Sequence, residues 1–327
     1  MKYQILNGFN RNQPIEKKCS RLIMGSGGFH QFKNKNDIYD ILNEFIKLGG
    51  NVLDTAHQYI DSERILGEWL SGREDRSDIY ILTKGAHPDD GEPGNRVNPK
   101  SITKDINESL ERLGTDYIDF YALHRDDESV PVGPIIELLN EHIASGKIHA
   151  IGTSNWSYQR IHEANLYADK NGLIGFMFNS PNLSLAKSNE PRWPGCVSVD
   201  DEMLNWHSGN QLPLFAWSSQ AGGFFSGNFS PEIRENEEIV RVYYSEDNWE
   251  RYRRAEKLAE EKEVSTIQIA LAYVLNQDFP TAAIIGPEKI AELVSSIEGA
   301  EIGLTKQEVD WLDLQANSMI GSVIDEA

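Results

Sequence analysis

The segment from Ile79 to His124 decides the fold: IYILTKG (79–85), a helix-like stretch (99–113) and YIDFYALH (117–124). Both short runs are rich in β-branched and aromatic residues, as buried strands are, whereas the stretch between them spaces its apolar residues as a helix does. A strand, a helix and a second strand in this order are typical of parallel strands joined by helices. The segment therefore predicts an α/β architecture.

The same alternation recurs along the whole chain. Strands are predicted at 20–26, 51–56, 79–85, 117–124, 148–156, 175–180, 212–219 and 282–287. Helices are predicted at 36–48, 62–71, 99–113, 132–146, 158–171, 200–208, 248–276 and 288–297. Eight such units over about 270 residues favour a closed (β/α)8 TIM barrel in a single domain spanning 1–327, although an open doubly wound sheet fits the same count. The longer segments 181–200 and 220–248 are expected to be loops at the functional rim.

Composition limits the classes of partner. The chain has 327 residues, 39% of them hydrophobic and 25% charged, which is typical of a globular protein. Its net charge of −20 repels nucleic-acid phosphates and anionic lipid surfaces. This charge argues against binding nucleic acid or a membrane, and leaves a small neutral substrate or a protein partner. Nothing in the sequence indicates an oligomeric state.

The cysteine content and the N-terminal sequence indicate the cellular compartment. Cys19 and Cys196 are the two cysteines, so the chain has neither a disulfide framework nor a cysteine-rich metal site. The first ten residues contain no apolar run of signal-peptide length, and no stretch is long and apolar enough to cross a bilayer. A soluble protein of the reducing cytoplasm is expected.

Four side chains at predicted strand ends indicate a chemistry. Asp54, Lys84 and His124 end three successive strands, and Tyr59 follows the first of them. Each alone has an ordinary structural explanation, as a turn cap, an ion-pair partner or a core histidine. Together they place costly charges and a phenol at the end of the barrel where catalysis occurs. An ammonium group lowers the pKa of a nearby phenol from about 10, so the cluster predicts proton transfer to a carbonyl oxygen.

A hydride donor would complete this chemistry, yet the usual nucleotide motifs fail. Gly25-Ser26-Gly27 begins a dinucleotide fingerprint, but His30 stands where its third glycine belongs. The glycines from Gly222 to Gly227 lack the Lys-Ser/Thr of a P-loop. Later strands instead present Ser154-Asn155, Asn179-Ser180 and Trp217-Ser218-Ser219, followed by AGGFFSG (221–227). Amides, an indole and bare backbone suit a flat amide-bearing ring and a pyrophosphate.

Five segments carry a family resemblance: GGNVLDTAHQY (49–59), ILTK (81–84), RLGTDYIDFYALHRDD (112–127), GKIHAIGTSNW (146–156) and FAWSSQAGGFFSG (215–227). In this order and spacing the chain resembles the aldo-keto reductases, a barrel family that reduces carbonyls with a nicotinamide cofactor. The resemblance implies that Tyr59 is the general acid and that Lys84 lowers its pKa. It also implies that Asp54 is the partner of Lys84 and that His124 orients the carbonyl.

The resemblance also implies a cofactor site. Ser154 and Asn155 would hold the carboxamide, together with Asn179 or Ser180, where many relatives carry glutamine. Trp217 would stack on the nicotinamide, where relatives usually have tyrosine. The backbone of Ser218, Ser219, Gln220, Gly222 and Gly223 would cradle the pyrophosphate.

The segment IIGPEKIAELVSS (284–296) would reach the adenosine end of the cofactor, with Gly286, Glu288, Lys289 and Ser296 as candidate contacts. The family default is NADP. Glu288, however, stands where a cation often meets the 2′-phosphate, and a carboxylate there repels that phosphate and accepts from a ribose diol. NADP and NAD both remain open.

We interpret the chain as a cytoplasmic NAD(P)H-dependent reductase of aldehydes or ketones, possible sugar-derived ones included. Trp156 and Trp193 are candidate substrate contacts, with packing as the alternative for each. One rival function is a Schiff-base aldolase that uses Lys84. A second is a cofactor-sensing partner subunit without turnover. A metal-dependent hydrolase is weaker, because the sequence has no His-x-His pair on a strand, and no metal is expected.

Overall fold

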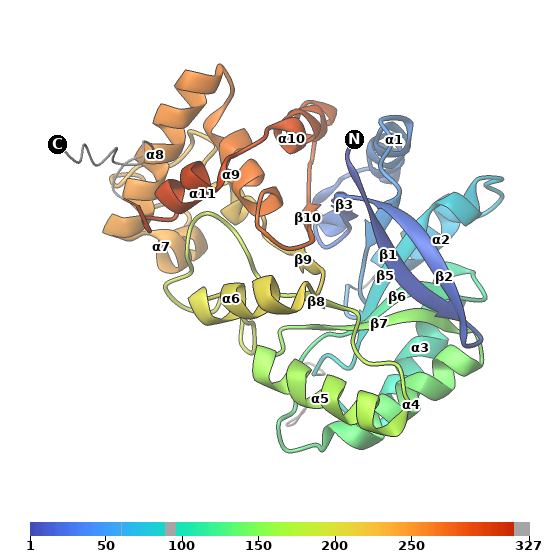
Figure 1. Ribbon diagram of the computed structural model, residues 1–327. Helices are drawn as coiled ribbons and strands as arrows, with labels where there is room; N and C mark the ends of the chain where they lie inside the picture. The colour runs from blue at the N-terminus through green and yellow to red at the C-terminus, as the bar shows by residue number, and fades with distance from the viewer. Residues whose placement is uncertain (60, 89–95, 317–327) are drawn as a thin grey trace.

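A closed barrel of eight parallel strands forms the centre of the protein (Figure 1). The computed structural model describes residues 1–59, 61–88 and 96–316. The strands are β3 (Leu22–Gly25), β4 (Val52–Asp54), β5 (Tyr80–Gly85), β6 (Ile118–Leu123), β7 (Ile148–Ser154), β8 (Phe178–Ser180), β9 (Leu214–Ala216) and β10 (Thr281–Ile285). They lie in chain order, and β10 pairs with β3 to close the ring. The predicted barrel is therefore confirmed, and the open sheet is excluded.

Helices connect the strands around the barrel. They are α1 (Lys35–Lys47), α2 (Ser62–Leu70), α3 (Pro99–Leu113), α4 (Val132–Ala144), α5 (Tyr158–Asn171), α6 (Asp201–Asn210), α8 (Glu246–Lys262), α9 (Thr266–Leu275) and α10 (Ile290–Glu301). Local signals set their ends: Asn98 caps α3 by accepting from the Ser101 N–H, and Gly114 ends it at a φ of 61°. Within the described part of the chain, no helix has the length and apolarity to span a membrane.

The structure differs from the predicted helices in one region. The predicted single helix 248–276 is two helices, because Glu263 adopts a φ of 56° and Ser265 forms a capping box with Gln268 that starts α9. Two short helices were also missed. They are α7 (Glu237–Tyr243), inside the expected loop 220–248, and α11 (Lys306–Leu312). Each has seven residues, which is too short for a convincing helical period.

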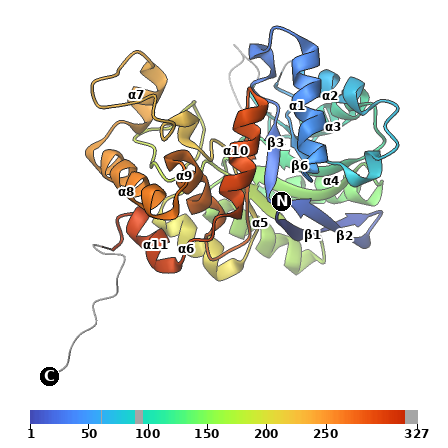
Figure 2. The same cartoon turned by 90° about the horizontal axis from the view of Figure 1, so that it is seen from above.

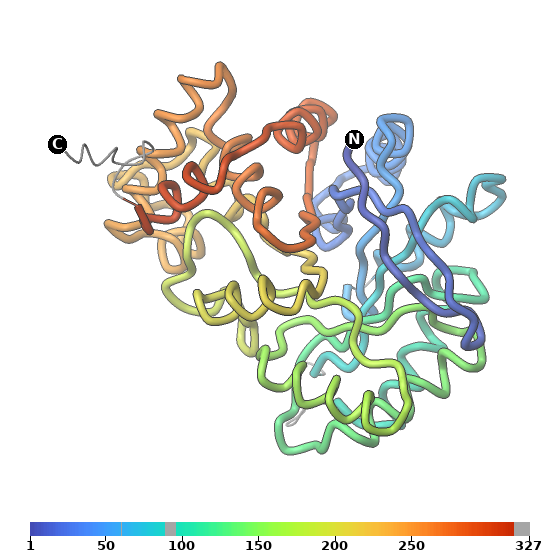
Figure 3. Tube along the Cα trace, viewed as in Figure 1, coloured from blue at the N-terminus to red at the C-terminus, as the bar shows by residue number. Residues whose placement is uncertain are grey.

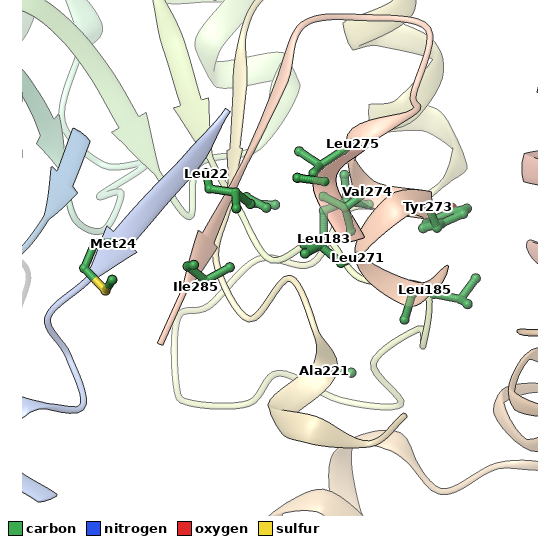
Figure 4. Packing of buried hydrophobic residues seen from close by; sticks show 14 of the residues in the cluster. Leu22, Met24, Leu183, Leu185, Ala221, Leu271, Tyr273, Val274, Leu275 and Ile285 are labelled. Carbon is green, nitrogen blue, oxygen red and sulfur yellow. The ribbon is translucent and has the colours of Figure 1, made fainter. Parts of the chain in front are cut away.

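The cluster formed by α7, α8, α9 and α11 lies on one side of the barrel (Figures 1 and 2). Figure 3 lets the chain be followed from β8 through the long 181–200 segment into α6. Leu183 and Leu185 of that segment join the same buried cluster as Leu271 and Val274 of α9 (Figure 4). The long rim segment is therefore anchored to the hydrophobic core.

The sequence interpretation also missed an N-terminal hairpin, β1 (Tyr3–Asn10) and β2 (Gln13–Ser20). Its Leu6 and Cys19 pack with residues of the barrel interior. It meets the second residues of β6 and β7, since Lys17 bonds Asp119 and Gly8 lies against His149. The hairpin therefore covers the N-terminal ends of the strands, opposite the end that carries Asp54, Lys84 and His124.

A buried ion pair fixes the hairpin to the barrel. Lys17 Nζ lies 2.6 Å from Asp119 Oδ1, and the side chains are 7% and 1% exposed. Asp119 also accepts from the Ile81 N–H at 2.9 Å. Burial alone would raise the pKa of Asp119, but His149, Lys17 and Arg76 together lower it below its ordinary value. The pair therefore contributes stability as long as the carboxylate is ionised.

We expect Lys17→Met to lower the free energy of unfolding by about 3 kcal/mol at pH 7, because it leaves a buried carboxylate without its cation. Because the pKa of Asp119 is depressed, this stability is present above the unfolded pKa of about 4 and is lost as the pH falls through the folded value. The cost should therefore shrink in acid. Urea denaturation followed by circular dichroism measures it, with the exposed neighbour Lys18→Met as the control. Equal effects of the two substitutions would contradict the prediction.

Candidate active site

The structure brings the four predicted side chains together at the C-terminal end of the barrel. Asp54 is the last residue of β4, Lys84 is the penultimate residue of β5, and His124 directly follows β6. These three strands are neighbours in the ring. Tyr59 lies in the turn before α2, where its N–H donates to Ala56 O at 2.9 Å. One end of the barrel therefore presents a carboxylate, an ammonium, an imidazole and a phenol.

Lys84 and Asp54 form a buried ion pair. The two side chains are 2% and 4% exposed, and Lys84 Nζ donates to Asp54 Oδ1 and, at 2.9 Å, to Thr55 O. Burial alone would lower the pKa of Lys84, but Asp54 and Tyr59 raise it above its ordinary value. Burial raises the pKa of Asp54, against the opposing charge of Lys84. Lys84 is therefore held as an ammonium group.

Tyr59 lies between this ammonium and the imidazole. Lys84 Nζ is 5.3 Å from the centroid of its ring, and the ring of His124 is 5.7 Å away at 75°. Burial raises the pKa of Tyr59 above 10, and the opposing effect of Lys84 is smaller. The expectation of a lowered pKa was therefore wrong in direction, because desolvation outweighs the charge. The phenol stays protonated at neutral pH, and Lys84 is placed to stabilise the phenolate that proton loss creates.

His124 is neutral. Burial, Lys84, Arg125 and His87 all lower its pKa, which lies well below 6.5. The residue is 6% exposed, and its Nδ1 has no hydrogen-bond partner among the described residues. A neutral imidazole has one donor and one acceptor, so it can donate to a carbonyl oxygen without adding a charge.

Serines at the ends of β7 and β8 link neighbouring strands through hydrogen bonds to main-chain oxygens. Ser154 Oγ donates to Ser180 O, and Ser180 Oγ donates to Phe215 O, both at 2.8 Å. Asn155 adopts a φ of 62°, and its amide donates to His124 O at 3.2 Å and accepts from the Val197 N–H at 3.1 Å. Asn155 thus ties the catalytic end of the barrel to the segment 181–200.

Asn179 and Ser180, which the sequence left as alternative contacts for the carboxamide, face opposite sides of β8. Asn179 accepts from Thr153 and donates to His207 of α6, so it points away from the barrel interior. Ser180 shares the interior face with Phe178, because alternate residues of a strand face the same side. The suggestion that Asn179 contacts a cofactor is therefore corrected, since its amide is engaged with the surrounding helix.

Asn182 is a buried residue that the sequence interpretation missed. Its amide donates to Trp217 O at 3.1 Å and accepts from Ser188 and Ser198. It therefore fixes the main chain of the proposed nicotinamide neighbour. A single asparagine in a loop carries no motif, so the sequence held no signal for this role.

The turn after Trp217 has the backbone of an anion site. Ser218, Ala221, Gly222 and Gly223 all have positive φ, of 48°, 51°, 61° and 85°. Ser219 Oγ donates to Ile284 O at 2.8 Å, which fixes the turn to β10. Successive amides in such conformations form a concavity for oxyanions. Its residues fit a pyrophosphate, and the buried Trp217 Nε1, unpartnered among the described residues, fits a neighbouring polar ligand.

Arg192 is a second residue that the sequence interpretation missed. It donates to Ser218 Oγ at 2.6 Å and pairs through two nitrogens with Glu238 of α7. The guanidinium also lies beside Gly222, whose ideal Cβ would be 3.5 Å from it. Arg192 therefore links the segment 181–200 to α7 next to the glycine turn.

The residues expected at the adenosine end differ in accessibility. Glu288 and Lys289 are exposed at the start of α10, just after Gly286, and the Glu288 N–H donates to Glu292 Oε2 at 2.9 Å. Ser296 is 4% exposed and its hydroxyl donates to Glu292 O within the same helix. The expectation for Ser296 is corrected, because its hydroxyl is already bonded and faces the core.

The two candidate substrate tryptophans also differ. Trp156 is 0% exposed, packs on Phe176 with ring centroids 5.3 Å apart, and donates to Arg125 O at 3.0 Å. It is a core residue and has no open face for a substrate, which corrects its assignment. Trp193 is 46% exposed and stacks on Trp217 at 5.8 Å and 30°. Trp193 therefore offers an accessible aromatic surface at the rim.

One described cluster has side chains close enough to hold a metal ion: His57, Asp105 and Glu108. Arg96 pairs with Asp105 at 2.6 Å, and Arg112 lies 3.5 Å from Glu108. His57 Nε2 is 2.7 Å from Glu108. These contacts already balance the carboxylates, so the cluster is an ion-pair network.

The chain is similar to known proteins over most of its length. The model of the family described as "Aldo/keto reductase family" matches residues 21–315. Norsolorinic acid reductase B of Aspergillus parasiticus is 29% identical over 296 residues, which are 86% of this chain and 74% of the relative. The uncharacterized oxidoreductase YrpG of Bacillus subtilis is 27% identical over 302 residues, covering 89% and 90% of the two chains. A crystal structure of a thermostable aldo-keto reductase with the inhibitor epalrestat has a TM-score of 0.71, with 21% identity, covering 97% of this chain and 100% of that one.

The state of Lys84 gives a prediction about Schiff-base chemistry. A Schiff base requires a neutral amine, whereas Lys84 is held as an ammonium by Asp54. We expect treatment with an aldehyde and borohydride, followed by peptide mass spectrometry, to leave Lys84 unmodified. The exposed Lys289 should become alkylated in the same sample and serves as the internal control. A substrate-dependent adduct at Lys84 would instead support the aldolase.

Proposed function

The chain belongs to the aldo/keto reductase family and is an NAD(P)-dependent oxidoreductase, and on that premise we propose that it reduces an aldehyde or ketone with Tyr59 as general acid. The observation that carries the proposal is the position of Tyr59 between the Lys84 ammonium and the neutral ring of His124. This arrangement can supply a proton to a carbonyl oxygen.

In the proposed reaction, side chains of the protein carry out the proton transfer. His124 donates a hydrogen bond to the carbonyl oxygen and orients it toward the hydroxyl of Tyr59. Tyr59 then gives its proton to this oxygen, and Lys84 stabilises the resulting phenolate, which burial alone would disfavour. A nicotinamide cofactor, when bound, would supply the hydride for the carbonyl carbon. Asp54 keeps Lys84 charged throughout.

The cofactor site is assigned to the C-terminal ends of β7, β8 and β9. Ser154, Asn155 and Ser180 lie where the carboxamide would be held, and Trp217 offers the stacking face. The turn from Ser218 to Gly223 would bind the pyrophosphate through its amides, with Arg192 alongside. Trp193 is the proposed contact for a ring-bearing substrate.

We propose NAD rather than NADP as the cofactor. Glu288 is exposed at the start of α10, where the family resemblance places the adenosine ribose. A carboxylate repels a 2′-phosphate and accepts hydrogen bonds from a free ribose diol. Lys289 is adjacent, and its charge reduces this repulsion.

We expect Tyr59→Phe to lower kcat roughly 100- to 10,000-fold, because it removes the proton donor without changing the ring. The dissociation constant of the cofactor should stay near that of the wild type. Steady-state reduction of 4-nitrobenzaldehyde and fluorescence titration with NADH and NADPH measure the two quantities. Full activity of the variant would refute the acid role. Absence of steady-state turnover in the wild type, with cofactor bound, would favour the sensing subunit.

We expect Glu288→Arg to shift the ratio of kcat/KM for NADPH over NADH upward by roughly 10-fold or more, since one charge-assisted hydrogen bond replaces a repulsion. The matched control is Glu298→Arg, which makes the same charge change at an exposed position further along the same helix. A ratio that does not change in Glu288→Arg would remove this residue from cofactor selection.

A further inference from the structure

Arg125 is a buried cation beside the proposed catalytic residues. It directly follows His124 and is 8% exposed. Its guanidinium donates to His124 O at 2.8 Å, to Cys196 Sγ at 3.3 Å and to Pro194 O at 3.4 Å. All three acceptors are neutral, and the last two contacts are long or weak.

Among the described residues, the other arginine that is equally buried has an acidic partner. Arg251, which is also 8% exposed, lies 3.5 Å from Asp313 Oδ1. Several partly buried arginines also pair with carboxylates: Arg96 with Asp105, Arg112 with Glu63, Arg160 with Asp126, and Arg192 with Glu238. Arg21, which is also partly buried, instead donates to the main-chain oxygens of Leu275 and Thr281 and to the Thr281 hydroxyl. Within residues 1–59, 61–88 and 96–316, no carboxylate lies within 4.0 Å of the Arg125 guanidinium. A buried cation without an anion is costly.

The charge of Arg125 is not balanced by the rest of the site. Lys84 is neutralised by Asp54, and His124 is uncharged. Arg125 also acts to lower the pKa of both Tyr59 and His124, so its positive charge is felt at these two side chains. The proton-transfer site therefore carries one excess positive charge, although the whole chain has a net charge of −20.

We propose that Arg125 binds a carboxylate of the substrate, so that the preferred substrates are carbonyl compounds that also carry a carboxylic acid. This inference rests on the proposed reductase function and names its substrate class. A guanidinium presents two parallel N–H groups that match the two oxygens of a carboxylate. One cation balances one monoanion, whereas a phosphate dianion would leave a charge unbalanced. The neutral substrate suggested by the overall charge is thereby replaced by an anionic one.

The test compares 4-carboxybenzaldehyde with its neutral methyl ester, methyl 4-formylbenzoate. We expect the wild type to reduce the acid with the higher kcat/KM. Arg125→Met should lower the acid-to-ester ratio of kcat/KM roughly 10- to 100-fold, as expected for a lost hydrogen bond to a charged group. Arg125→Lys, which keeps the charge, should lower it less. Arg253→Met removes an exposed arginine of α8 and should leave the ratio unchanged.

A purely structural role for Arg125 would change the rates for acid and ester equally, and that result would overturn the inference. A second arm uses the wild type alone, in case Arg125→Met does not fold. Benzoate should inhibit competitively against the ester substrate, and methyl benzoate should inhibit at least 10-fold more weakly. Equal inhibition by both compounds would also overturn the inference. Failure of the wild type to reduce either aldehyde, with cofactor bound, would instead refute the proposed reductase function.

Discussion

The ion pair between Lys84 and Asp54 is the interaction on which the C-terminal end of the barrel depends. Both groups are almost fully removed from water, so neither would be charged there without the other. The pair spans two neighbouring strands and therefore requires the barrel to be in register. It also affects its surroundings: Tyr59 lies beside the Lys84 ammonium, and Lys84 adds to the effect of burial in lowering the pKa of His124.

Much of the barrel and of the proposed catalytic residues follows from local sequence patterns. β5 and β6 are apolar runs and α3 has clear caps, and Asp54, Lys84 and His124 are recognisable because they end apolar strands. Features that depend on long-range contacts were not predictable in this way. The amides of Asn155 and Asn182 are used by segments distant in sequence, and Arg192 becomes important through Glu238, which is 46 residues away.

The sequence also misjudged the balance of two opposing electrostatic effects at Tyr59. A neighbouring ammonium can be inferred from the spacing of strand ends, whereas the depth of burial cannot. Burial outweighs the ammonium, so the phenol is a weaker acid than in water and the lysine limits that loss. The net charge of the chain likewise did not predict the local positive charge at Arg125. The fold determines which groups a buried side chain contacts, and the acceptors around Arg125 are neutral.

The hairpin β1–β2 has a consequence for the order of events during synthesis. It forms through local pairing, but its buried partner Asp119 lies 102 residues after Lys17 in the chain. A ribosome therefore releases the hairpin long before the strands that it seals exist. Until then its apolar face, which includes Leu6 and Cys19, is exposed to water, and a hairpin of two strands is only marginally stable alone. The hairpin can therefore bury this face only after β6 has been synthesised.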